Sequence, residues 1–250
     1  MNISEDIHRA VVEGDWSSIH AWLVQTQRDV NAPVDDHGTT LLMLVAEWAN
    51  NRDDYVEGGA FRPGRSGSYV ALAQELLALG ANPNLSNPNN VTALHMVARG
   101  HGPETLAIVN LLLRHNADVH AKSAIGATAL AYGIFFSAIS CDDRPRRIVC
   151  ALLRAGASLD ACYGTQSADE LLSARPEDDP RLKALVADVR KAGSYERWLK
   201  VPRKEVIVLR ALALKGRATT TYPALQVLVD VPNEIAWNIL SFWNVAVPWD

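Results

Sequence analysis

The sequence has few of the residues that build disulfide frameworks, zinc sites or membrane spans. It contains three cysteines, Cys141, Cys150 and Cys162, an odd number with no Cys-x-x-Cys pair. This usage argues against a disulfide scaffold and suits reduced thiols inside a cell. No stretch approaches about 18 uncharged apolar residues, and Met1 to Arg9 lack the basic start and apolar run of a secretion signal. We therefore expect an intracellular protein, cytoplasmic and/or nuclear.

The sequence also has only a small excess of charge of one sign and few catalytic motifs. The 24 Lys and Arg residues stand against 28 Asp and Glu residues, a net charge of −4 that does not suggest a nucleic-acid binder. Neither a His-Glu-x-x-His nor a Gly-x-Ser-x-Gly motif occurs, and the seven histidines are scattered. We expect no enzyme, no metal site and no cofactor.

One segment comes close to a phosphate-binding loop. Residues 59–66 fit that pattern except that Arg65 replaces its Lys. Pro63 removes one of the backbone N–H donors that would converge on phosphate, and the segment follows an expected helix rather than a strand. We interpret it as part of a loop insert. An enzyme with a site built by this insert stays an alternative.

A repeated pattern runs through most of the chain. One copy reads VTALHMVA at 91–98 and IVNLLLRHNADVHA at 108–121. An earlier copy has GTTLL at 38–42 and LLALGANPN at 76–84, and a later one has GATAL at 126–130 and VCALLRAGASLD at 149–160. The first copy keeps only residues 7–10, 14–15 and 29–32 of the pattern. Aligned on Asn31, Asn84, His120 and Asp160, the copies lie 53, 36 and 40 residues apart.

This pattern resembles the ankyrin repeat, in which a turn leads into two helices and the period is about 33 residues. Leu41, Ala93 and Ala129 replace the family's turn proline, and its histidine remains only at His8 and His95. The resemblance implies that these histidines bond the neighbouring turn.

The resemblance implies an all-α fold, an ankyrin-repeat solenoid of about five helix-turn-helix repeats with short β-hairpin-like fingers and a C-terminal helical extension. Thr40, Thr92 and Thr128 should cap the first helices, and the second helices should end at the left-handed positions of Gly80, Asn116 and Gly156. The solenoid is expected at 1–192, with repeats at about 4–34, 35–87, 88–123 and 124–162, a degenerate cap at 163–192, an insert at 50–68 and the extension at 193–250.

The function implied by the resemblance is non-catalytic protein binding on a concave surface, by a monomer. The expected finger contacts are Asp36, His37, Asn89, Asn90, Ala124, Ile125, Tyr163 and Thr165. The expected inner-helix contacts are Met43, Glu47, Trp48, Met96, Arg99 and Tyr132. Replacing Met96 by Arg or Tyr132 by Ala is expected to weaken binding and to leave folding intact.

The last 58 residues follow a different pattern. An apolar helix is expected at 206–216, followed by a polar linker at 217–222 and a helix that begins near Pro232. This order is similar to the SOCS box and to the F-box-like (PRANC-type) module of poxvirus ankyrin proteins, which recruit ubiquitin-ligase cores. That resemblance implies recruiting residues at Leu209, Leu212, Pro232, Ile235, Leu240 and Trp243, although the adaptor-binding Cys of the SOCS helix is missing. The alternative is a helical hairpin that only caps the last repeat.

Overall fold

The computed structural model describes most of the first 198 residues of the chain. The described ranges are 3–13, 15–26, 29–50, 55–56, 60–61, 68–100, 102–137, 144–160, 162–173 and 180–198. The chain divides into two compact units, residues 1–184 and 185–250. The division falls within helix α10 (Pro180–Ala192), whereas the sequence analysis places a boundary after residue 192. The limits of the individual repeats stay predictions.

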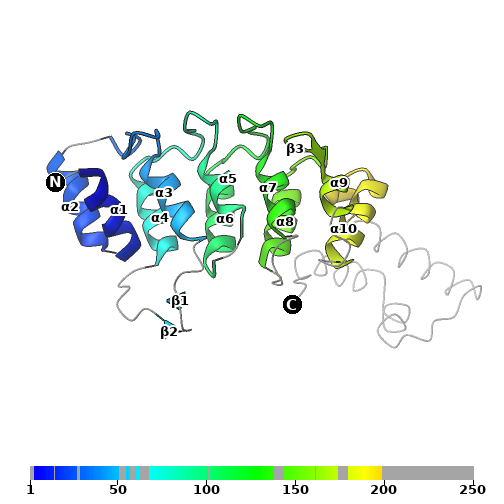
Figure 1. Cartoon of the computed structure of the whole chain (residues 1–250), viewed down its shortest axis with the longest axis horizontal. Helices are drawn as coiled ribbons and strands as arrows, with labels where there is room; N and C mark the ends of the chain where they lie inside the picture. Colours follow the sequence, from blue (N-terminus) through cyan, green and yellow to red (C-terminus); the bar gives the residue numbers. More distant parts are fainter. Residues whose placement is uncertain are drawn as a thin grey trace, which may run out of the picture. The chain divides into compact units, whose positions relative to one another are not determined.

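The first unit consists mainly of short helices that follow one another in pairs. Their bounds are α1 Ile3–Glu13, α2 Trp16–Thr26, α3 Leu41–Trp48, α4 Tyr69–Ala78, α5 Ala93–Val97, α6 Thr105–Arg114, α7 Ala129–Ser137, α8 Arg144–Arg154 and α9 Ala168–Ser173. The first helices α3, α5 and α7 contact one another in that order, and the second helices α4, α6 and α8 do the same (Figure 1). No sheet larger than two strands occurs among the described residues, so the all-α expectation is confirmed for them.

The strands form two small antiparallel hairpins. One pairs β1 (Tyr55–Val56) with β2 (Ala60–Phe61) inside the expected insert. The other pairs β3 (Cys162–Tyr163) with β4 (Gln166–Ser167), in the turn that precedes α9. Hairpin-like connections between helix pairs agree with the expected fingers, whereas the hairpin of β1 and β2 lies within a segment expected to be a loop.

The apolar core runs through successive pairs. Its largest fully buried side chains include Leu44, Leu76, Leu94, Leu112, Leu130 and Ile148, which come from six consecutive helices, α3 to α8. No single pair could enclose these side chains alone, so each pair depends on its neighbours for burial.

The expected capping residues begin the first helix of each pair. Thr40 Oγ1 accepts a hydrogen bond from Met43 N at 3.4 Å, and Thr128 Oγ1 accepts one from Ala131 N at 3.4 Å. At Thr92 the backbone N–H donates to His95 Nδ1 at 3.2 Å, which forms one half of a capping box. The predicted caps are therefore confirmed at Thr40 and Thr128, whose hydroxyls satisfy N–H groups that a helix start leaves without an intrahelical partner. The Thr92 hydroxyl lies 2.9 Å from His95 Nδ1 instead.

The expected left-handed residues end the second helices. Gly80, Asn116 and Gly156 have φ values of 92°, 59° and 93°. Ala81 N, Ala117 N and Ala157 N then bond back to carbonyl oxygens of the preceding helix at 2.9–3.0 Å. Glycine and asparagine adopt this conformation with the least strain, so the predicted helix ends are confirmed.

The ends of the insert are fixed parts of the packed unit. Asn50 is buried, its Nδ2 donates to the carbonyl oxygens of Ala46 and Met96, and its Oδ1 accepts from Gly100 N at 2.9 Å. At the other end, the Glu104 carboxylate accepts a hydrogen bond from Val70 N at 2.9 Å at the start of α4. Asn50, the first residue of the expected loop insert, is therefore part of the packed unit, because it bonds to the next helix pair.

His95 links α5 to the turn that follows. It is 1% exposed, and its Nε2 lies 3.1 Å from Ala127 O, while Nδ1 accepts from Thr92 N. These contacts fit the neutral ring protonated at Nε2. Burial lowers the pKa of His95, and the hydrogen bond to Ala127 and the charge of Asp118 oppose this effect only in part. The predicted role of His95 in bonding the neighbouring turn is confirmed.

Two asparagines bridge one turn to the next helix end in the same way. Asn31 Nδ2 donates to Gly80 O at 3.2 Å and its Oδ1 accepts from Asn82 N at 2.7 Å. Asn84 repeats both bonds with Asn116 O at 3.0 Å and Asp118 N at 2.7 Å. His120 holds the aligned place in the next copy, and among the described residues its side chain forms no such bridge.

The described part of the second unit is short. It comprises the end of α10 and a following turn in which Trp198 N donates to Ser194 O at 2.9 Å. The rings of Tyr195 and Trp198 lie 5.3 Å apart. Residues 199–250 are outside the described part of the chain, and with them Leu209, Leu212, Pro232, Ile235, Leu240 and Trp243. None of the described helices is both long and apolar enough to cross a membrane.

Asn84→Ala should lower the free energy of unfolding by about 1–2 kcal/mol, because two solvent-exposed hydrogen bonds between neighbouring helix pairs are lost. His120→Ala is the matched control at the aligned position and should change it by less than about 0.5 kcal/mol. Urea unfolding followed by circular dichroism measures both. Equal effects of the two substitutions would contradict the bridging role of Asn84.

The burial of neutral His95 should make the protein less stable as the pH falls below 6.5, the ordinary histidine value. The unfolded chain binds a proton there that the folded chain resists, so the free energy of unfolding decreases from pH 6.5 downward. Urea unfolding at pH 7.5 and 5.5 should show a larger loss for the unchanged protein than for His95→Gln. His115→Gln, at an exposed site, should keep the full loss. An equal loss in His95→Gln would refute the prediction.

Candidate protein-binding surface

Most of the expected binding residues that are exposed lie in the turns that join one helix pair to the next. These turns leave from the same edge of the first unit (Figure 1). Tyr163 in β3 is half-buried, and the other expected finger residues are exposed. The exposed ones are Asp36, His37, Asn89, Asn90, Ala124, Ile125 and Thr165.

Side-chain acceptors hold two of these turns in the same conformation. Asp35 Oδ1 accepts from His37 N at 2.9 Å and from Thr39 N at 2.8 Å. Asn87 Oδ1 accepts from Asn89 N and Val91 N, both at 3.0 Å. A carboxylate or amide oxygen that bonds the backbone two and four residues later fixes a tight turn.

Neighbouring turns also contact one another. Ala124 N donates to Asn89 O at 2.8 Å, which joins the third turn to the second. A Cβ atom on Gly38 would lie 2.8 Å from Cδ of Pro88, so the first and second turns are in close contact. We call these joined turns, residues 35–39, 87–91 and 123–127, the turn ridge. Its order in the free chain reduces the entropy that binding would cost.

The expected contacts on the inner helices differ in their accessibility. Glu47 is exposed, and Trp48 and Arg99 are partly exposed. Met43, Met96 and Tyr132 are 1%, 8% and 8% exposed, so they are core residues rather than surface contacts.

The reason for this burial is that first helices have neighbours on two sides and a second helix behind them. In α3 all six residues from Leu41 to Ala46 are buried. Met96→Arg would place a charge in this core and Tyr132→Ala would leave a cavity, so both should destabilise the fold. This burial contradicts the surface position assumed for Met96 and Tyr132, and we now expect both substitutions to impair folding.

Aromatic side chains gather where α5, α7 and β3 meet. We call the group His95, Arg99, Tyr132, Phe135, Phe136 and Tyr163 the aromatic cluster. Ring centroids are 5.5 Å apart for His95–Tyr132, 5.1 Å for Tyr132–Tyr163 and 4.4 Å for Phe135–Tyr163. The last pair is stacked with an interplanar angle of 3°.

Arg99 completes the cluster as its cation. Its Cζ lies 5.6 Å from the centroid of the Phe136 ring, within the range of a cation–π contact. Its Nε is buried and makes no hydrogen bond to any described residue. Burial raises the pKa of Tyr163, and nearby Tyr132 raises it further, while the charge of Arg99 opposes both effects. The Tyr163 phenol therefore stays neutral and can donate a hydrogen bond.

The structure brings together three of the predicted site residues, Arg99, Tyr132 and Tyr163, from three separate elements. Phe135 and Phe136, which are both partly exposed, were not predicted as contacts. The available signal was their spacing from Tyr132, since residues three and four apart share a helix face.

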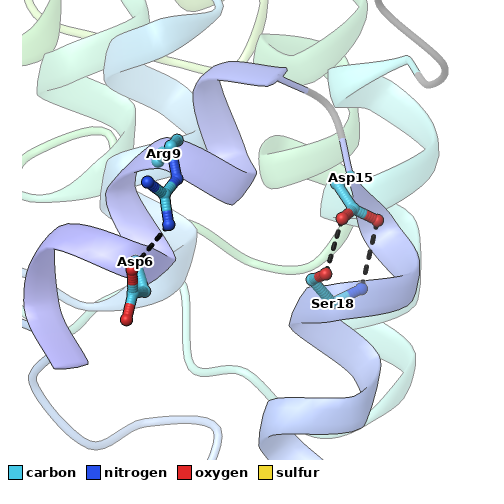
Figure 2. A network of polar contacts seen from close by, with 4 residues as sticks. All are labelled: Asp6, Arg9, Asp15 and Ser18. Carbon is cyan, nitrogen blue, oxygen red and sulfur yellow. Dashed lines mark hydrogen bonds and ion pairs between the residues drawn. The ribbon is translucent and has the colours of Figure 1, made fainter. Parts of the chain in front are cut away.

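A second candidate is a hollow of ≈ 480 Å³ lined by α1 and α2. Figure 2 shows four of its polar residues: Asp6 pairs with Arg9 at 2.6 Å, and Asp15 accepts from Ser18 Oγ at 2.5 Å and Ser18 N at 3.2 Å. The hydrogen bonds from Ser18 lower the pKa of Asp15, so this carboxyl stays ionised and caps α2. These contacts account for the polar groups structurally.

Groups of ligating side chains that could hold a metal ion do not occur in the described ranges. Most of the segment that approaches a phosphate loop, namely residues 59 and 62–66, lies outside them.

Comparison with known proteins supports the repeat pattern at its most regular copy. The sequence model of the ankyrin repeat family matches residues 89–124, which include α5, α6 and the turn after α6. No curated protein matches the chain. The ankyrin repeat is a generic protein–protein interaction module and is typically non-catalytic. The chain thus carries an ankyrin repeat at residues 89–124, and this match supports an ankyrin-repeat protein.

Proposed function

We propose that the chain is an ankyrin-type solenoid of about five repeats that binds a partner protein on its turn ridge and the adjoining aromatic cluster. The observation that carries the proposal is the turn ridge itself, whose outermost residues, such as Asp36, Asn89 and Ile125, are exposed on turns that are internally hydrogen-bonded and joined to one another. Only one repeat matches the family model, so the other repeats rest on the recurring caps and left-handed helix ends.

The composition of this surface suits protein recognition. Ile125 is 49% exposed at the tip of the third turn, and the partly exposed Trp48, Arg99 and Tyr163 belong to residue types enriched at binding hot spots. The mechanism is complementarity of shape and charge, with no bond-making step. The proposed compartment is intracellular, cytoplasmic and/or nuclear, and the proposed state is a monomer.

Ile125→Asp should remove partners that the unchanged protein captures, because it places a charge on an apolar tip of the turn ridge. Leu79→Asp is the matched control: Leu79 is 56% exposed, but it lies at the C-terminal cap of the second helix α4, outside the turn ridge. Affinity purification with quantitative mass spectrometry should show partners lost in Ile125→Asp and kept in Leu79→Asp. Thermal melts verify that both variants fold. Partner sets that do not differ between the two variants would argue against the turn ridge.

A second proposal is that residues 193–250 recruit a ubiquitin-ligase core while the repeats hold its substrate. It is favoured by the sequence order of apolar helix, polar linker and Pro232-initiated helix with Glu234 in the first turn. The alternative is that these residues only cap the last repeat.

The recruiting role predicts that Leu240→Asp with Trp243→Ala, in the full chain, abolishes capture of a ligase adaptor but keeps the partners of the turn ridge. A chain that ends at Ala192 should behave in the same way. If the full chain, the double variant and the truncated chain all capture identical partners, residues 193–250 are a cap only.

A further inference from the structure

The aromatic cluster holds a cation that has no anionic partner among the described residues. No described carboxylate lies within salt-bridge distance of Arg99, in contrast to Arg9, which pairs with Asp6 at 2.6 Å in α1. Arg99 is partly exposed, while its Nε is buried without a hydrogen-bond partner. A guanidinium carries five N–H donors in a rigid fork, so this arrangement leaves donors for an acceptor from outside.

The Tyr163 phenol beside it adds a neutral donor. The ring of Tyr163 lies 5.1 Å from that of the buried Tyr132, and the charge of Arg99 acts on the Tyr163 phenol. His95 adds no charge, because it is buried and bonded to Ala127 and Thr92. The cluster therefore presents one positive charge and the Tyr163 phenol next to partly exposed aromatic rings.

We infer that the aromatic cluster binds an aspartate or glutamate side chain of the partner, with the carboxylate on Arg99 and an adjacent apolar residue on the Phe135–Tyr163 stack. This inference rests on the proposed protein-binding function and names the chemistry of the partner segment.

Charge and geometry favour a carboxylate over a phosphorylated residue. A phosphate group carries about −1.5 to −2 charges at neutral pH, whereas the cluster supplies a single cation. The fork of an arginine matches the two oxygens of a carboxylate, and hydrogen bonds between such charged groups are about twice as strong as neutral ones. The stacked rings at 4.4 Å provide a flat apolar area beside that contact.

The test is a selection of random peptides displayed on phage against the immobilised full chain. Peptides selected by the unchanged protein should be enriched in Asp or Glu beside an apolar residue. Arg99→Gln should abolish this enrichment, and the best peptide should bind it about tenfold more weakly, the usual effect of losing a charged hydrogen bond. Arg114, an exposed arginine in the last turn of α6, provides the matched control. Arg114→Gln should keep both the enrichment in acidic peptides and the affinity for the best peptide.

A double-mutant cycle separates direct contact from a structural effect of Arg99. Replacing the peptide's acid by its amide should weaken binding to the unchanged protein about tenfold and to Arg99→Gln hardly at all. Arg99→Lys keeps the charge and the apolar stem, so it should retain part of the acid preference. A cycle with no coupling would overturn the inference even if Arg99→Gln lost stability.

The remaining outcomes are distinct. Enriched peptides without acids, unaffected at Arg99, would overturn the inference and leave the protein-binding function standing. A selection that enriches no peptide would overturn both.

Asp142 and Asp143 lie in the connector after α7, outside the described residues, so the selection is repeated with both changed to Asn. An acid preference that emerged only in this variant would assign Arg99 to the chain's own connector and overturn the inference.

Discussion

The structure depends on polar groups of one helix pair bonding to the backbone of the next. Asn84 reaches Asn116 and Asp118, and Asn50 reaches Met96 and Gly100. A short pair cannot enclose its own apolar face, so it must stack, and stacking removes water from backbone groups at the junction. At the buried Asn50 the side chain replaces that water, whereas the bonds of Asn84 are exposed to solvent. The junctions bridged in this way are thus stabilised by apolar burial and also fixed in register by directional bonds, which apolar contact alone would not provide.

This constraint explains the properties of the exposed turns. The helix pairs bury their apolar side chains in the core. The turns are held by hydrogen bonds within each turn and by the hydrogen bond from Ala124 N to Asn89 O. The exposed residues of the turns therefore contribute little to folding. Residue types such as those at Asp36, Asn89 and Ile125 can differ without disturbing the junctions, which is a suitable condition for a binding surface. A fixed frame with replaceable exposed residues also loses less entropy when it binds than a loose loop would.

The sequence predicted the features that depend on local chemistry. A threonine hydroxyl at Thr40 or Thr128 caps the helix that follows it, and glycine at 80 and 156 permits the left-handed end, so each could be inferred from a few neighbouring residues. The burial of Met43, Met96 and Tyr132 could not be inferred in this way, because it depends on packing against helices that lie far away in the sequence. The role of Asn50 was missed for the same reason, since its bonding partner Met96 lies 46 residues away. Exposure at the turns was predictable because those residues lie outside the helices.

The charge of the whole chain limits what the aromatic cluster can contribute. A net charge of −4 repels an acidic segment at long range, so attraction to Arg99 becomes effective only within about a Debye length, roughly 8 Å at physiological salt. Such a contact adds little to the rate of association and acts mainly on the lifetime and specificity of the complex. Holding Arg99 on Phe136 instead of on a carboxylate suits this role, since a ring orients the guanidinium without neutralising it. The cluster is therefore better suited to select one acidic side chain, already placed by contacts along the turns, than to attract acidic proteins in general.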